Sequence, residues 1–240
     1  MSACILTRDK GLGGITAADK GAHVQLLIPI ILALAILSGC GGGGGDAVGG
    51  GSGDTGGGDT GGGDTGGGGG DGEVDPRLTR LGYYEAQKTR VLGDPATGVT
   101  GIAPTLAMLP DQGTMQFSGF ATLRLEGPLE LVMSGDAVVN VNFASQQISG
   151  EMDKFFGTLP NSGIADYAGR ITITGGHVQQ DLSLDYAGAL SGGGQDLVLS
   201  GRLVGAFLGD PVRALAAADL DPTVLQNGQV RTGTLLLVAE

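Results

Sequence analysis

Apolar and polar residues alternate in short runs over most of the chain after Pro110. Alternation with a period of two is typical of β-strands that bury one face. The runs are separated by segments rich in Gly, Pro, Asn and Ser, which favour turns. The alternating apolar residues, which we expect to form the buried face, are Phe117, Ala121, Leu123, Val139, Val141, Phe143, Ile148, Met152, Ile171, Ile173, Leu182, Leu184, Tyr186, Leu197, Leu199, Leu203, Phe207, Leu235 and Leu237.

The breaks between these runs predict the number of strands. With a further run near residues 213–218, they leave about eight strands, and an antiparallel meander of that size commonly closes because closure removes exposed edges. The prediction is an all-β fold, an eight-stranded antiparallel up-and-down barrel, with a two-sheet sandwich as the alternative. Glycines that suit the bends of a small barrel are Gly119, Gly150 and Gly201. The expected turns lie at residues 126–128, 160–163, 175–176, 191–194 and 226–228.

A segment with helical spacing precedes the β region. Asp75 before Pro76 is typical of a helix N-cap and first turn, and Gly93 before Asp94 is typical of a helix end. The sequence therefore predicts an amphipathic helix over residues 76–92. Its aromatic pair, Tyr83 and Tyr84, either packs the helix onto a neighbour, which is the commoner role, or lines a ligand site. The apolar and long side chains that recur at helical spacing are Leu78, Leu81, Tyr84, Lys88, Val91 and Leu92.

The N-terminal region contains one uncharged apolar run, at residues 26–37. The run is shorter than the about 20 residues of a membrane-spanning helix and has the length of a signal-peptide core. Acidic residues are interleaved with the basic ones before it, and a translation start near Val24 is an alternative. We expect residues 1–39 to be a signal peptide.

Leu37, Ser38, Gly39 and Cys40 resemble the lipobox of bacterial lipoproteins. The resemblance implies cleavage before Cys40 and acylation of its thiol and its new N-terminus, with an ordinary signal peptide or a short anchor as the alternative. Two or more acyl chains anchor a protein stably to a membrane. In place of the aspartate that marks inner-membrane retention stands Gly41, so the resemblance favours the outer membrane.

Residues 41–72 are rich in glycine and repeat Gly-Gly-Gly-Asp-Thr. Such a segment has no apolar surface to offset the entropy of ordering, and we expect a flexible tether over residues 40–74. Calcium-binding β-rolls are also rich in Gly and Asp, but they repeat every nine residues and carry an apolar residue in each repeat. The expected organisation continues with a helical lead-in at 75–107 and the barrel domain at 108–240.

Charge and residue content exclude several function classes. The net charge of -12 and pI of about 4.4 argue against nucleic-acid binding, which needs clustered Lys and Arg. Both cysteines, Cys4 and Cys40, precede the barrel domain, whose one histidine is His177, expected in a turn. Glu151 and Asp153 share a strand face and are better explained as solvated. We therefore expect no catalytic residue, metal site or cofactor, and no enzyme.

Three segments resemble the β-barrel domain of transferrin-binding protein B: Met108-Leu109-Pro110 through Phe117-Ser118-Gly119, residues 135–150, and Gly205-Ala206-Phe207-Leu208-Gly209-Asp210-Pro211. The resemblance spans about residues 108–240. It implies an eight-stranded barrel displayed on the outer membrane of Gram-negative bacteria by a lipid on Cys40. The function it implies is a surface module that binds an extracellular protein or a small solute, with ligand residues unassigned. A structural envelope lipoprotein without a specific ligand is the alternative.

Overall fold

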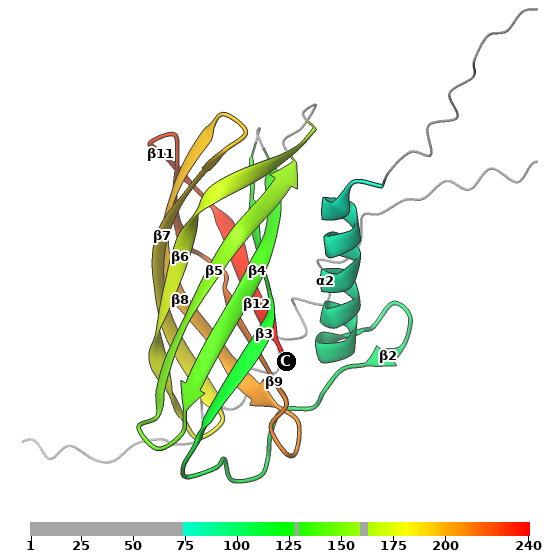
Figure 1. Cartoon of the computed structure of the whole chain (residues 1–240), viewed down its shortest axis with the longest axis vertical. Helices are drawn as coiled ribbons and strands as arrows, with labels where there is room; N and C mark the ends of the chain where they lie inside the picture. Colours follow the sequence, from blue (N-terminus) through cyan, green and yellow to red (C-terminus); the bar gives the residue numbers. More distant parts are fainter. Residues whose placement is uncertain (1–73, 128–129, 159–162) are drawn as a thin grey trace, which may run out of the picture. The chain divides into compact units, whose positions relative to one another are not determined.

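The computed structural model describes residues 74–127, 130–158 and 163–240. The expected signal peptide, the lipobox with Cys40 and the glycine-rich tether lie outside these residues. The described chain contains a helix, a two-stranded ribbon and an antiparallel barrel (Figure 1). Within this part of the chain, no helix has the length and apolar character needed to cross a membrane.

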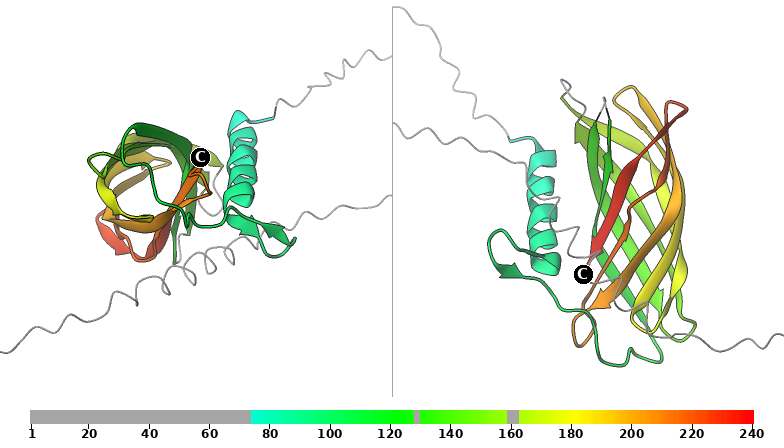
Figure 2. Two further views of the ribbon diagram at one scale, coloured as in Figure 1. Left: turned by 90° about the horizontal axis from the view of Figure 1, so that it is seen from below. Right: turned by 180° about the vertical axis from the view of Figure 1, so that it is seen from behind.

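The barrel is an antiparallel meander that closes on itself, as the view along its axis shows (Figure 2). β8 pairs with both β9 and β10, which together form the seventh strand, and β11 with β12 forms the eighth. β12 then pairs with β3 and closes the ring. The predicted eight-stranded up-and-down barrel is confirmed, and the sandwich is wrong. The strands are β3 (Thr114–Leu125), β4 (Leu131–Asn142), β5 (Gln147–Thr158), β6 (Ile164–Val178), β7 (Asp181–Gly192), β8 (Gln195–Leu208), β9 (Ala214–Asp219), β10 (Thr223–Gln226), β11 (Gln229–Arg231) and β12 (Gly233–Ala239).

Side chains fill the interior of the barrel. Every alternating apolar residue that the sequence assigned to the buried face belongs to one continuous core. Phe155 covers Gly135, where an added Cβ would lie 2.7 Å from the phenyl ring. An eight-stranded barrel has an interior just wide enough for its own side chains, and here they occupy it.

The predicted helix is confirmed at both ends as α2 (Pro76–Leu92). The Asp75 side chain accepts a hydrogen bond from the Arg77 N–H at 2.9 Å, which caps the first turn. Gly93 ends the helix with a positive φ of 82° and donates its N–H to the Thr89 carbonyl. The ribbon of β1 (Gly93–Asp94) and β2 (Val99–Thr100) follows.

The structure corrects one predicted turn. Gly175 and Gly176 lie within β6, and the chain reverses after Val178 instead. An added Cβ at Gly175 would lie 2.2 Å from the Ser183 carbonyl oxygen, so this glycine permits close approach of β7 rather than a turn. His177 is therefore a strand residue that is buried at one end of the barrel, not a turn residue.

Candidate functional site

Helix α2 packs on the outer wall of the barrel through Tyr84. The Tyr84 ring stacks on Phe120 of β3 and Phe156 of β5, with centroids 5.2 and 6.2 Å apart. The Arg80 guanidinium lies 4.9 Å above the Phe156 ring. Tyr83 points away and is 69 % exposed. Packing, rather than ligand binding, accounts for the buried position of the Tyr84 ring.

The same contact contains a charged network around Asp136 of β4. Asp136 accepts hydrogen bonds from the Tyr84 hydroxyl, from Arg80 at 3.1 Å and from Lys154 at 3.0 Å. Burial alone would raise the pKa of Asp136, but these hydrogen bonds and the charge of Arg80 outweigh it and hold the pKa below its usual range. Burial and the neighbouring carboxylate raise the pKa of Tyr84 to about 12, so the hydroxyl stays a donor.

A second polar group lies against the core at Tyr186 of β7. Its hydroxyl donates to Asp219 at 2.9 Å, and the same carboxylate accepts the Arg202 N–H at 3.1 Å. An added Cβ at Gly201 would lie 2.2 Å from that carboxylate, so this glycine makes room for the pair. Burial, followed by the charge of Asp219, raises the pKa of Tyr186. The other oxygen of Asp219 accepts the Asp221 N–H at 3.1 Å, so both carboxylate oxygens have partners and the group is structural.

One end of the barrel, here called the loop end, is formed by residues 101–113 and by the turns at 143–146, 179–180 and 209–213. Two hollows of about 520 and 440 Å³ lie there, on either side of residues 105–111. Met108 borders both hollows and is 97 % exposed, and Leu106 borders the larger one and is 93 % exposed. These are large apolar side chains with almost no contact to the rest of the described chain.

Hydrogen bonds from the main chain and from the Thr105 side chain hold the base of this loop in place. Thr105 is buried, and its N–H donates to the Phe207 carbonyl at 3.0 Å while its hydroxyl donates to the Gly209 carbonyl at 2.6 Å. The Gly209 N–H in turn donates to the Ala103 carbonyl at 2.8 Å. The exposure of Leu106 therefore follows from how the loop is anchored.

His177 closes the barrel beneath the larger hollow. Its ring packs edge-on against Phe143 and Phe207, with centroids 5.8 and 5.4 Å away. The Nδ1 atom lies 3.1 Å from the Gln179 carbonyl, whereas Nε2 is buried and has no hydrogen-bond partner among the described residues. No titratable side chain in the described part of the chain bonds to His177, which packs as part of the aromatic end of the core.

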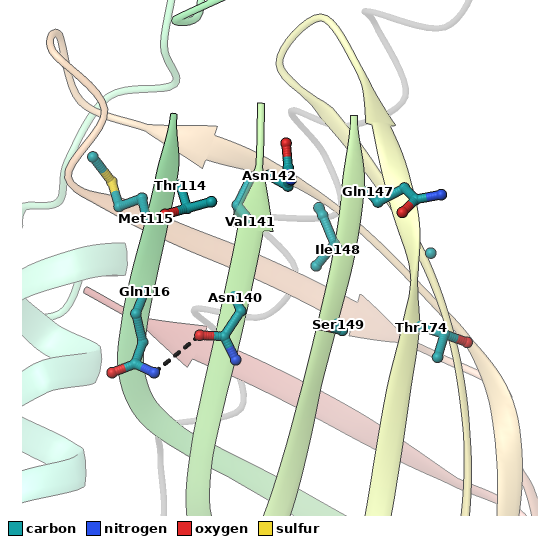
Figure 3. A pocket seen from close by; sticks show the side chains of 11 residues that line it. Thr114, Met115, Gln116, Asn140, Val141, Asn142, Gln147, Ile148, Ser149 and Thr174 are labelled. Atoms are coloured by element: carbon teal, nitrogen blue, oxygen red, sulfur yellow. Dashed lines mark hydrogen bonds between the residues drawn. The ribbon is translucent and has the colours of Figure 1, made fainter. Parts of the chain in front are cut away.

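A third hollow, of about 670 Å³, lies on the outer wall across β3 to β6 (Figure 3). Its lining contains no charged and no aromatic residue. One row of its side chains crosses four neighbouring strands in register, and a second row lies beside it towards the loop end. We call the seven exposed polar side chains of these rows the polar wall: Thr114, Gln116, Asn140, Asn142, Gln147, Ser149 and Thr174.

The residues that the sequence considered for chemistry are dispersed. Glu151 pairs with Arg170 at 2.8 Å on the barrel exterior, as expected of a solvated face. In the described residues, no three His, Cys, Asp or Glu side chains lie close enough together to hold a metal ion. Sequence reasoning did not single out the loop end or the polar wall, although Met108 and Pro110 stood in the segment it compared with a known family.

The chain was compared with protein-family models, curated proteins and solved structures, and none matched. The resemblance to transferrin-binding protein B thus stays a hypothesis that rests on the segments quoted above. The loop end and the polar wall are the two candidate binding surfaces of the described chain.

Proposed function

We propose that this protein is a lipid-anchored binding module of the outer membrane that engages a protein partner through the loop end of its barrel. The observation that carries the proposal is the near-complete exposure of Leu106 and Met108 on an anchored loop beside two hollows. Exposed apolar side chains that lie close together mark interaction sites, and Leu106 and Met108 line the same hollow. Methionine also adapts well to varied partners.

The position of the loop end supports this reading. Arg77, in the first turn of α2, bonds to the Ile164 carbonyl at 3.0 Å, where β6 begins. The last turn of α2 lies near the loop end, since the Ile102 N–H donates to the Val91 carbonyl. The described chain therefore begins at the opposite end of the barrel, so a flexible tether before Val74 would leave the loop end away from the point of attachment.

The filled interior favours a partner that binds outside the barrel over a solute carried within it. Burying the two exposed side chains would contribute roughly 3–6 kcal/mol, at about 1.5–3 kcal/mol each. That energy is enough to anchor a modest protein interface once further contacts are added around the hollows.

A photo-crosslinking amino acid in place of Met108 tests the proposal in living cells. We expect a discrete protein adduct, and we expect none when the same amino acid replaces Val230, which is 77 % exposed on β11. Equal labelling at both positions, or none at either, would contradict a partner at the loop end. A structural lipoprotein would instead be revealed by loss of envelope integrity in a deletion strain.

The anchor is tested separately. Cys40→Ala should abolish incorporation of a labelled fatty acid, because the thiol is the acylated group. Persistent labelling would exclude the proposed lipobox. Protease treatment of intact cells should release the barrel from the surface; protection until the outer membrane is permeabilised would place it in the periplasm.

A further inference from the structure

The polar wall differs chemically from the strand surfaces beside it. Ion pairs flank it, with Glu151 bonded to Arg170 at 2.8 Å and Asp185 bonded to Arg202 at 2.7 Å. Inside the hollow, every polar side chain is a neutral amide or hydroxyl. The strand register places the neutral side chains together and apart from the charged ones, because Gln116 pairs with Asn140 and Asn140 with Ser149.

Most of the hydrogen-bonding groups in the hollow have no partner among the described residues. The side-chain amide of Gln116 donates to the side-chain carbonyl of Asn140 at 2.9 Å (Figure 3). The Asn142 side chain accepts the Ser145 N–H at 3.1 Å. The Asn140 amide group and the Gln116 carbonyl bond to no other described residue. The same holds for the side chains of Thr114, Gln147, Ser149 and Thr174, which line the hollow from the same four strands.

These groups select the chemistry of a ligand. A charged ligand would meet no opposite charge to replace its hydration, and an apolar ligand would leave the amides that it covers unpaired. A neutral ligand rich in hydroxyl groups matches them, since hydroxyl and carboxamide groups each donate and accept hydrogen bonds. From this geometry we propose that the polar wall binds a neutral oligosaccharide chain.

The dimensions agree with such a ligand. Neighbouring strands lie about 4.8 Å apart, so the four strands present a face roughly 14 Å wide, suited to a few linked sugar rings. The volume of about 670 Å³ lies within the usual range of small-ligand sites. Binding is weak because the hollow is open and has no aromatic ring on which a sugar could stack.

Titration calorimetry on the purified full chain, in a detergent without a sugar headgroup, tests the proposal. The probes are cellohexaose, maltohexaose and N-acetylchitohexaose, with a hyaluronan hexasaccharide as the charged comparison. We expect at least one neutral probe to bind and the charged probe to fail. Asn140→Asp and Gln116→Ala should each raise Kd about five- to tenfold, the loss expected for one or two hydrogen bonds.

The matched control is Gln229→Ala, an exposed glutamine on β11 outside the hollow, which should leave Kd unchanged. Positions 116 and 140 are exposed, so thermal melts of all three variants should confirm that the barrel is folded. The proposal is overturned if no neutral probe binds up to its solubility limit, or if Kd is unchanged in both Asn140→Asp and Gln116→Ala. It is also overturned if Asn140→Asp leaves Kd unchanged and instead abolishes the protein adduct at position 108.

Discussion

The contact between α2 and the barrel can be tested by shortening Tyr84, which is 7 % exposed. Tyr84→Ala removes the ring buried on Phe120 and Phe156. Burial of such a ring contributes about 2 kcal/mol, and its stacking about 1 kcal/mol more. The lost hydrogen bond to Asp136 adds about 1 kcal/mol, so Tyr84→Ala should cost about 4 kcal/mol.

Tyr84→Phe keeps the ring and removes only the hydroxyl. Asp136 retains Arg80 and Lys154 and is partly exposed, so water can replace the lost donor. This variant should cost about 1 kcal/mol. For a domain of this size, 1 kcal/mol lowers Tm by about 2–4 °C, which predicts a fall of roughly 2–4 °C for Tyr84→Phe and 8–16 °C for Tyr84→Ala.

Thermal melts of the full chain followed by circular dichroism measure these shifts. Tyr83→Ala is the matched control, because that neighbouring tyrosine is exposed and should leave Tm almost unchanged. If Tyr84→Ala melted together with Tyr83→Ala, the helix would not belong to the cooperative unit of the barrel, and the reasoning would be refuted. Equal losses for Tyr84→Phe and Tyr84→Ala would assign the energy to the hydroxyl rather than the ring.

Three further predictions concern two glycines, the closing strand β12 and the charge of Asp136. Gly119→Ala should destabilise the barrel by about 1–3 kcal/mol, because its Cβ would lie 2.0 Å from the Val238 carbonyl oxygen. Gly82→Ala, which has open space around it in α2, should stabilise the protein by about 1 kcal/mol. Denaturant unfolding measures both changes in free energy, and changes of the same sign would contradict the geometry. Deletion of residues 234–239 should abolish the cooperative melt, since β12 bonds to both β3 and β9; a retained melt would argue against closure by this strand. The depressed pKa of Asp136 implies stabilisation that is complete above its unfolded pKa of about 3.9 and is lost as the pH falls through the folded pKa. The native protein should therefore lose more stability between about pH 5 and pH 2 than the Asp136→Asn variant does. Equal losses for the two proteins in unfolding titrations would exclude this contribution.

Local sequence was sufficient for the elements whose pattern is independent of their neighbours. The period of two assigns one strand face to the core wherever the chain is extended, which is why residues such as Ile171 and Leu184 were placed correctly. The ends of α2 were equally predictable, because Asp75 and Gly93 complete the hydrogen bonds of the terminal turns within a few residues.

Glycines were harder to interpret, because the sequence does not show what faces them. Gly175 resembled a turn residue, yet a glycine is needed there because the Ser183 backbone of the next strand leaves no room for a side chain. Phe156 follows Phe155 directly, and both are buried, which alternation alone does not explain. The register shifts between Asp153 and Phe155, and α2 then covers Phe156 on the outside of the barrel.

The two candidate binding surfaces were decided by tertiary structure alone. Gln116, Asn140, Ser149 and Thr174 belong to four strands, and each by itself is an ordinary exposed strand residue. They form one row only because the hydrogen-bond register of neighbouring strands aligns them. Leu106 is exposed for a similar reason, since Thr105 bonds to strand β8 and to Gly209, about a hundred residues along the chain, contacts that no local pattern encodes.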